Sequence, residues 1–202
     1  MPEGQEGTAS TSPASSYRPL IALTGATGFI GQHLLRELPK RGYRLRVLLR
    51  RPSATPINCA SALIGDLLRP HNMSEALAEV DAVIHTAGVA QTMSGVPEDD
   101  YRLLNAEATM KLARAAERVG VRRFVFLSSI RAQSGSTAEG VLTETLEPRP
   151  TDAYGRSKLA AEQGLVQAKE MLRVVGGPTT EVPDCMREPV QKGVAKASPP
   201  RA

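Results

Sequence analysis

The 202 residues, 41% of them hydrophobic, predict one domain with a hydrophobic core and flanking tails. The formal net charge of +4 is modest, and no run interleaves basic with aromatic residues, so nucleic-acid binding is not expected. No apolar run approaches the roughly 20 residues that a membrane span needs. Residues 1–18 lack the apolar stretch of a signal peptide, so we expect a cytoplasmic protein without membrane contact.

Residues 1–18 are rich in Ser, Thr, Pro and Gly and are predicted to form a disordered arm. Beyond them, short apolar runs alternate with segments of helical periodicity. The predicted strands are 19–25, 43–50, 61–66, 81–88 and 122–129, and the predicted helices are 29–42, 72–80, 101–120 and 151–172. This alternation is typical of right-handed crossovers between parallel strands. We therefore predict an α/β fold over residues 19–172, a doubly wound parallel sheet of the Rossmann type.

Local signals mark the ends of two predicted helices and the tail. Asn72 and Glu75 fit a capping box that would begin the helix 72–80. Gly120 fits a C-cap that would end the helix 101–120. Residues 173–202 contain repeated prolines and no helical periodicity, so we predict a mostly disordered tail.

Three glycines, Gly25, Gly28 and Gly31, lie between the first predicted strand and the first predicted helix. A helix N-terminus offers unpaired N–H groups and a partial positive charge, which suit a diphosphate. We assign Gly25 to the tight turn, Gly28 to the close approach of the phosphate and Gly31 to the packing of helix on strand. A glycine-rich turn can be a turn and nothing more, but this position favours a bound dinucleotide.

The second predicted strand ends at Arg50 and Arg51. An Asp or Glu there would accept hydrogen bonds from a 2′-hydroxyl and repel a 2′-phosphate. Either arginine can pair with a 2′-phosphate, although solvated surface charges would look almost the same. The expected cofactor is therefore NAD or NADP, with a slight preference for NADP.

Tyr154 and Lys158 are four residues apart on a predicted helix and therefore share one face. Such a pair alone is weak evidence, but here it follows Ser128 and Ser129 at the end of the fifth predicted strand. The ammonium of Lys158 favours the phenolate of Tyr154, which can accept a proton from a substrate hydroxyl. By contrast, His85 at the end of a buried strand is expected to be a core histidine. The cysteine and histidine spacing predicts no metal site.

Five motifs in order resemble the extended short-chain dehydrogenase/reductase family of NAD-dependent epimerases and dehydratases. They are TGATGFIG (24–31), GDL (65–67), VIHTAG (83–88), Asn105 in LLNAEAT, and FLSSIRAQSG (126–135) followed by YGRSK (154–158). The resemblance covers about residues 19–170. It is strongest for nucleotide-sugar 4-epimerases.

The resemblance implies a catalytic set of Ser129, Tyr154 and Lys158, in which Ser129 holds the substrate oxygen and its developing charge. It also implies that Asp66 meets the adenine. The residues expected to bind the cofactor are Gly25, Thr27, Gly28, Phe29, Ile30, Gly31, Arg50, Arg51, Asp66, Leu67, Thr86, Ala87, Gly88, Asn105, Tyr154 and Lys158.

The resemblance also bears on the reaction. Dehydratases of the family carry an Asp-Glu pair directly after the catalytic Ser or Thr, and this sequence has Ile130 and Arg131 there. Dehydration is therefore disfavoured. Epimerisation of a UDP-sugar at C4 by transient hydride transfer is preferred, and NAD(P)H-dependent carbonyl reduction needs the same residues and stays open. A homodimer through helices of the domain is a further expectation.

Family members continue after the tyrosine helix into a further strand and a long substrate-binding lobe. The corresponding part of this sequence is short, so the substrate lobe is expected to be largely missing and the chain resembles a family member truncated at its C-terminus. A non-catalytic module that binds cofactor or a partner through an exposed sheet edge is the competing hypothesis.

Overall fold

The computed structural model describes residues 17–54, 59–89, 95–135, 137, 140–143 and 145–175, with side chains up to residue 168 in the last helix. Its strands form one parallel sheet in the order β3-β2-β1-β4-β5. The strands are β1 (Leu20–Thr24), β2 (Arg44–Leu49), β3 (Ala60–Leu63), β4 (Ala82–His85) and β5 (Arg123–Phe126). The predicted doubly wound parallel sheet is confirmed.

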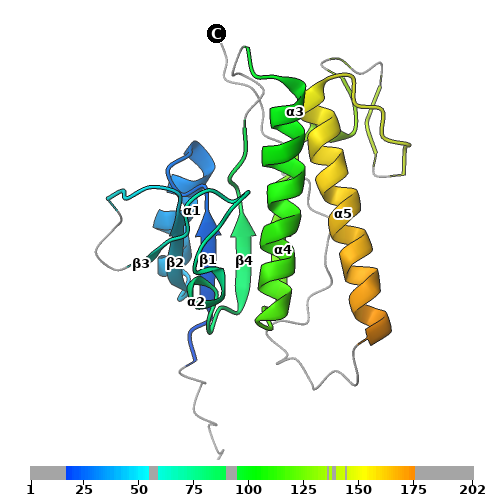
Figure 1. Ribbon diagram of the computed structural model, residues 1–202. Helices are drawn as coiled ribbons and strands as arrows, with labels where there is room; N and C mark the ends of the chain where they lie inside the picture. Colours follow the sequence, from blue (N-terminus) through cyan, green and yellow to red (C-terminus); the bar gives the residue numbers. More distant parts are fainter. Residues whose placement is uncertain are drawn as a thin grey trace, which may run out of the picture.

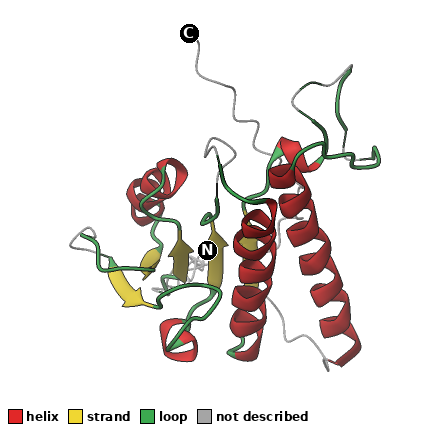
Figure 2. Ribbon diagram, turned by 45° about the horizontal axis from the view of Figure 1, so that its top comes forward, coloured by secondary structure: helices red, strands yellow, loops and turns green. Residues whose placement is uncertain are grey.

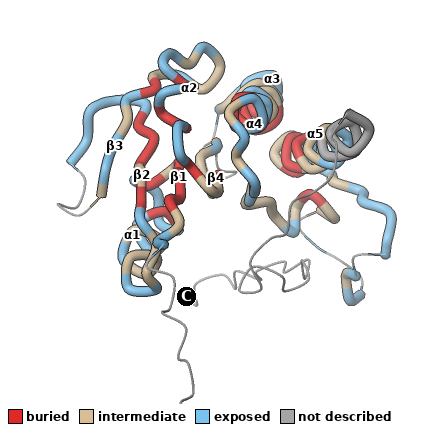
Figure 3. Tube along the Cα trace, turned by 90° about the horizontal axis from the view of Figure 1, so that it is seen from below, coloured by how far each residue is buried: buried red, intermediate tan, exposed pale blue. Residues whose placement is uncertain are grey.

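Helices cover both faces of this sheet. They are α1 (Phe29–Lys40), α2 (Met73–Ala76), α3 (Glu98–Tyr101), the π-helix η1 (Arg102–Glu107), α4 (Ala108–Arg118), the 3₁₀-helix η2 (Ile130–Ala132) and α5 (Ala153–Val175). Helix α1 lies on one face of the sheet and α2 and α4 lie on the other (Figures 1 and 3). The long helices α4 and α5 run side by side, with α5 beyond the β4 side of the sheet (Figures 1 and 2). No helix in the described ranges is long and apolar enough to cross a membrane.

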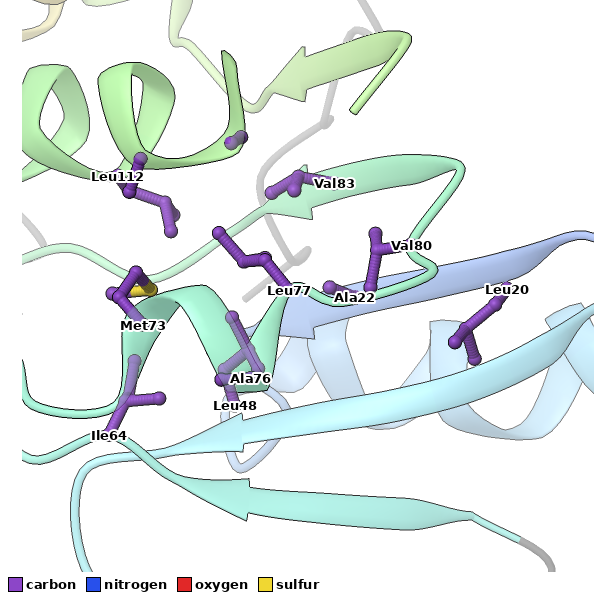
Figure 4. Close-up of a cluster of buried hydrophobic side chains, with 12 residues drawn as sticks. Leu20, Ala22, Leu48, Ile64, Met73, Ala76, Leu77, Val80, Val83 and Leu112 are labelled. Atoms are coloured by element: carbon purple, nitrogen blue, oxygen red, sulfur yellow. The ribbon is translucent and has the colours of Figure 1, made fainter. Parts of the chain in front are cut away.

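Two clusters of buried side chains hold these layers together. The larger lies on the α4 face, where Leu77 and Leu112 pack against Ala22, Leu48 and Val83 of the strands (Figure 4). The smaller cluster, on the α1 face, joins strand residues to α1 and consists of Leu23, Ala26, Val47 and Leu49 with the partly buried Leu34, Leu35, Cys59 and Ile84. Strand β1 is buried along its whole length because both clusters use it.

The predicted capping box at Asn72 is wrong. Asn72 has the left-handed conformation, with φ 55°, and its side chain makes no capping hydrogen bond. Asn tolerates this conformation better than most residues. The helix that follows is the single turn α2, which ends at Ala76, rather than the predicted 72–80, and Glu79 beyond it has a positive φ of 61°.

The predicted helix 101–120 is three consecutive segments, α3, η1 and α4. Its predicted end is confirmed, because Gly120 has φ 80° and the Gly120 and Val121 amides donate to the carbonyls of Glu117 and Ala116. The predicted arm and tail fall mainly on residues 1–16 and 176–202, which lie outside the described residues.

Candidate active site

A cleft of about 410 Å³ opens at the carboxyl ends of β1, β2 and β4. The order of the strands reverses between β1 and β4, because the chain goes from β1 to β2 on one side and returns to β4 on the other. Crevices at such a switch point are the usual ligand sites of open parallel sheets. Ten of the predicted cofactor residues line it: Gly25, Thr27, Gly28, Arg50, Arg51, Asp66, Leu67, Thr86, Ala87 and Gly88.

In the glycine-rich turn, neighbouring backbone atoms lie too close to leave space for a side chain. Gly25 has φ 70°, and a Cβ built there would lie 2.5 Å from Thr86 Oγ1 and 2.6 Å from the Ala87 nitrogen. A Cβ on Gly31 would lie 2.1 Å from the Gly25 carbonyl oxygen. Gly28 is the N-cap of α1 and provides no side chain to bond the N–H groups of the first turn. Those groups are therefore free to serve a ligand.

The remaining residues of this motif, Phe29, Ile30 and Gly31, are not among the lining residues. The Phe29 side chain is 92% exposed. Gly31 is buried beneath the turn, which fits its expected role in packing helix on strand. Their assignment to the cofactor site stays a prediction.

Asn105 lies behind the wall of the cleft rather than in it. Its Oδ1 accepts a hydrogen bond from the Val89 N–H (2.7 Å), and its Nδ2 donates to the Val89 carbonyl (3.1 Å) and to Ser157 Oγ (3.0 Å). Val89 does line the cleft. The buried amide of Asn105 therefore fixes the loop after β4, and a Cβ on Gly88 would lie only 2.7 Å from its Oδ1.

Lys158 extends from α5 to the β4 side of the cleft. Its Nζ donates to the Leu127 carbonyl (3.0 Å), lies 4.6 Å from the centre of the Phe126 ring, and would lie 3.6 Å from a Cβ on Gly88. Burial lowers the pKa of this amine to about 8, against the opposing charge of Glu162. The ammonium is thus close to the cleft wall although it is not a lining residue.

Ser129 follows the carboxyl end of β5, and Tyr154 lies at the start of α5. The Tyr154 ring centre is 6.0 Å from Lys158 Nζ, and the ring packs edge-on against Tyr101 with 6.2 Å between centroids. Ser129 is the N-cap of η2, and its Oγ accepts a hydrogen bond from the Arg131 N–H (3.2 Å). Within the described ranges, Ser128 Oγ is buried without a hydrogen-bond partner.

His85 is fully buried and belongs to a chain of hydrogen bonds. The Thr109 hydroxyl donates to the Asn105 carbonyl (2.6 Å), so it accepts from His85 Nε2 (2.9 Å). Nδ1 of the same ring then accepts from the Thr24 hydroxyl (2.6 Å). Burial, aided by the charge of Lys158, lowers the pKa of His85 to about 3. His85 is therefore a neutral core histidine, as expected.

The sequence motifs missed several residues that line the cleft, among them Ser53, Val89, Leu104 and Ala108. Leu104 and Ala108 are four residues apart and share one helical face, within the predicted helix 101–120 that carries Asn105. Ser53 and Val89 lie in loops and carry no periodic signal. Within the described ranges, no group of three or more His, Cys, Asp or Glu side chains could hold a metal ion.

Residues 21–178 match the model of a family described as the NAD dependent epimerase/dehydratase family. A 3-beta-hydroxysteroid dehydrogenase of Mycolicibacterium neoaurum is 30% identical over 71% of this chain and 41% of its own length. A UDP-glucose 4-epimerase of Vibrio cholerae is 34% identical over 72% of this chain and 46% of its own. The chain thus spans less than half the length of these curated relatives.

A solved structure, MoeE5 in complex with UDP-glucose and NAD, is 35% identical to this chain. It aligns with a TM-score of 0.64 over 73% of this chain and 48% of its own. The similarity therefore extends over most of the described sheet and helices, and about half of that structure has no counterpart here.

Proposed function

Because this chain belongs to the NAD-dependent epimerase/dehydratase family, we propose that its cleft binds NAD or NADP and that it serves the 4-epimerisation of a UDP-sugar by transient hydride transfer. The UDP-glucose 4-epimerase among its relatives and the UDP-glucose held by MoeE5 support this substrate class. The chain spans less than half the length of those relatives, so the proposal concerns the cofactor half and its catalytic residues.

One observation carries the proposal: Lys158 Nζ lies 6.0 Å from the centre of the Tyr154 ring and would lie 3.6 Å from a Cβ on Gly88 in the cleft wall. A surface lysine would not be 5% exposed at the carboxyl end of β4, with its ammonium donating to the backbone carbonyl of Leu127. Burying an amine is costly unless it is paired, and ionisable groups buried at such a cost cluster at functional sites. Support of a phenolate beside the cleft is such a function.

The cleft suits a dinucleotide on its own geometry. A Cβ on Gly25 would collide with Thr86 and Ala87, and a Cβ on Gly88 would collide with Asn105 behind the wall, so both turns need bare backbone at the edge of the cleft. The start of α1 would hold the diphosphate and Asp66 would meet the adenine. A bound dinucleotide supplies a nicotinamide ring that takes a hydride from the sugar and returns it.

The chain's own residues would move the proton. The Tyr154 phenolate accepts the proton of the sugar 4-hydroxyl, and the Lys158 ammonium stabilises the negative charge before that transfer. Ser129 donates a hydrogen bond to the same sugar oxygen and holds it within reach. After the 4-keto sugar has rotated in the site, the same tyrosine returns the proton to the sugar oxygen. One site therefore serves both halves of the reaction.

The second candidate is an NAD(P)H-dependent carbonyl reductase, which needs the same residues. The steroid dehydrogenase among the relatives favours it. Epimerisation leaves the cofactor in its starting redox state, whereas reduction consumes NAD(P)H. Absorbance of the reduced nicotinamide during turnover would separate the two reactions. A non-catalytic module remains the third candidate.

The test of the enzyme is UDP-sugar interconversion by the wild type and Tyr154→Phe, with Tyr43→Phe as a control far from the cleft. We expect Tyr154→Phe to lower the rate by about 10²–10⁴-fold, the usual contribution of a general acid–base group. Its dinucleotide affinity, from isothermal titration, should stay at the wild-type value. Equal rates in the wild type and Tyr154→Phe would contradict the enzyme, and no heat with either dinucleotide would contradict the cofactor site.

The preference for NADP over NAD is a separate proposal, supported by Arg50 and Arg51 at the rim of the cleft. The solved structure of MoeE5 holds NAD, so the choice between NAD and NADP has to be tested on this chain itself. Replacing both arginines by glutamine should weaken NADP by about tenfold or more and leave NAD nearly unchanged, since charge-assisted bonds contribute about 1.5–3 kcal/mol each. Arg36→Gln on α1 is the control. Equal wild-type affinity for the two dinucleotides would rule the preference out.

We also propose the homodimer through helices of the domain. The helices α4 and α5 run side by side (Figure 2), and Val166 of α5 is 58% exposed. Sedimentation velocity of the wild type and Val166→Glu would test it. A wild type that stays monomeric at every concentration would contradict it.

A further inference from the structure

Arg131 contacts both parts of the predicted catalytic set. Its backbone N–H donates to Ser129 Oγ (3.2 Å). Its guanidinium donates to Oδ2 of Asp152, from Nε at 2.9 Å and also from Nη2. Asp152 directly precedes α5, whose second residue is Tyr154. Both side chains of the pair are mostly buried, 17% and 28% exposed, so this ion pair is shielded more than a surface pair.

Asp152 also caps the helix that carries Tyr154. Its Oδ1 accepts a hydrogen bond from the Gly155 N–H (2.7 Å), the third amide of α5. Burial alone would raise the pKa of this carboxyl, but the Gly155 amide and the Arg131 guanidinium together hold it below its usual value. One carboxylate thus bonds the start of α5 with one oxygen and the serine turn, through Arg131, with the other.

The first turn of α5 rests directly on the backbone of Arg131. A Cβ on Gly155 would lie 2.2 Å from the Arg131 carbonyl oxygen and 3.0 Å from Pro150 Cβ. Gly155 is buried and adjoins Tyr154 in the chain. The turn that carries the tyrosine and the turn that carries the serine are therefore in direct contact through the backbone of residue 131.

We propose that Arg131 and Asp152 are positioning residues that fix the Tyr154 phenol relative to the Ser129 hydroxyl. The inference rests on the proposed function, in which both groups hold one sugar oxygen. Arg131 bonds Ser129 and Asp152 bonds the first turn of α5, and neither residue lines the cleft, so the proposed role of the pair runs through Ser129 and Tyr154.

Three variants of Arg131 and Asp152 and one control variant separate the contributions of the two residues. Arg131→Met removes the guanidinium and keeps an apolar stem, and Arg131→Lys keeps the charge without the fork. Asp152→Asn keeps a capping oxygen and removes the charge. Arg156→Met is the matched control, because Arg156 pairs with Glu98 from the same first turn of α5 with side chains 48% and 65% exposed (Nε to Oε1 3.0 Å).

The first readout is the split between kcat and KM in UDP-sugar interconversion. We expect Arg131→Met to lower kcat by about 10–100-fold, because small misplacements of reacting groups cost that much. KM for the sugar and the dinucleotide dissociation constant should stay within about twofold. Arg131→Lys should recover part of the loss, and Arg156→Met should behave as the wild type. The double variant Arg131→Met with Asp152→Asn should be little worse than the worse single variant, since the two residues act as one unit.

The second readout does not depend on turnover. Hydrogen exchange of the Gly155 amide should be faster in Arg131→Met than in the wild type, while amides of β1 keep their protection. Arg156→Met should leave Gly155 exchange unchanged.

Wild-type kcat together with wild-type Gly155 exchange in Arg131→Met would overturn the inference. So would a parallel loss of kcat, KM and dinucleotide affinity, which is the pattern of a general structural defect. A wild-type chain that binds dinucleotide and converts no UDP-sugar would overturn the proposed function instead. The positioning pair would then be judged on Gly155 exchange alone, where unchanged protection in Arg131→Met contradicts it.

Discussion

Lys158 is a buried amine whose pKa is lowered to about 8 by burial, from 10.5. Folding therefore disfavours its protonated form. Below pH 8 the amine is protonated in both the folded and the unfolded chain, and the full burial cost is present. Between pH 8 and 10.5 the unfolded chain binds the extra proton, so the free energy of unfolding rises with pH.

The first prediction compares the wild type with Lys158→Met. From pH 8 to 9.5 the wild type should gain about 1.5 kcal/mol of unfolding free energy relative to the variant, because the slope begins at about half of the full 1.4 kcal/mol per pH unit and rises above pH 8. Urea denaturation at half-unit pH steps measures the difference between the two curves. Parallel curves over this window would show that Lys158 titrates near its usual pKa and that its burial carries no cost.

His85 shifts stability at the opposite end of the pH range. Its pKa, lowered to about 3, keeps the ring neutral in the folded chain, whereas the unfolded chain protonates it below about pH 6.5. Stability from this group is complete above pH 6.5 and is lost as the pH falls toward 3. The wild type should lose about 2 kcal/mol more than His85→Gln between pH 7 and 5. Guanidinium denaturation at the two pH values tests this, and an equal loss in both proteins would contradict the neutral ring.

At the scale of elements, the π-helix η1 sets the position of the loop after β4. Asn105, within η1, bonds both backbone groups of Val89 and also Ser157, and it is buried. Asn105→Ala would leave the Val89 groups and the Ser157 hydroxyl without this partner, at a cost of about 1–3 kcal/mol for each unsatisfied group. π-Helical turns often occur at functional sites.

The same contacts of Asn105 predict an effect on dinucleotide binding. Asn105→Ala should lower the midpoint of thermal unfolding and weaken dinucleotide binding, because Val89 lines the cleft. Arg102→Ala, in the same π-helix with an exposed side chain, should do neither. Calorimetric melting and isothermal titration give the two quantities. Wild-type affinity in a destabilised Asn105→Ala would separate the loop from the cofactor site.

The sequence predicted those elements and site residues that are related by a short, regular spacing along the chain. The glycine turn and the Tyr154–Lys158 pair were visible because one turn of backbone or helix relates their residues. The Arg131–Asp152 pair was not, since it joins two segments 21 residues apart. The failed capping box has the same origin, because Asn72 took a left-handed conformation that no i, i+3 pattern records. Cleft residues in loops, such as Ser53, depended equally on the tertiary fold.

At the scale of the whole molecule, the two faces of the sheet are covered unequally. On the α4 face, Phe124 packs against the core cluster that α2 and α4 complete. Strand pairing sets Val125 beside Ile84, which belongs to the α1 face. Figure 3 shows α1 lying beneath β1 and β2, away from β4. Val125 is accordingly 51% exposed although it is the centre of a strand.

An apolar strand at the end of a sheet favours association between chains. We predict that the wild type self-associates as its concentration rises and that Val125→Thr associates less, because threonine keeps the β-branch that suits a strand and adds a hydroxyl to the exposed face. Val141→Thr is the control, since Val141 is 83% exposed in a loop. Sedimentation velocity over a concentration series, with circular dichroism to verify that all three proteins are folded, makes the comparison. Equal association of the wild type and Val125→Thr would show that the open part of the α1 face does not attract another chain, because the substitution changes that face and leaves the rest of the surface as it was.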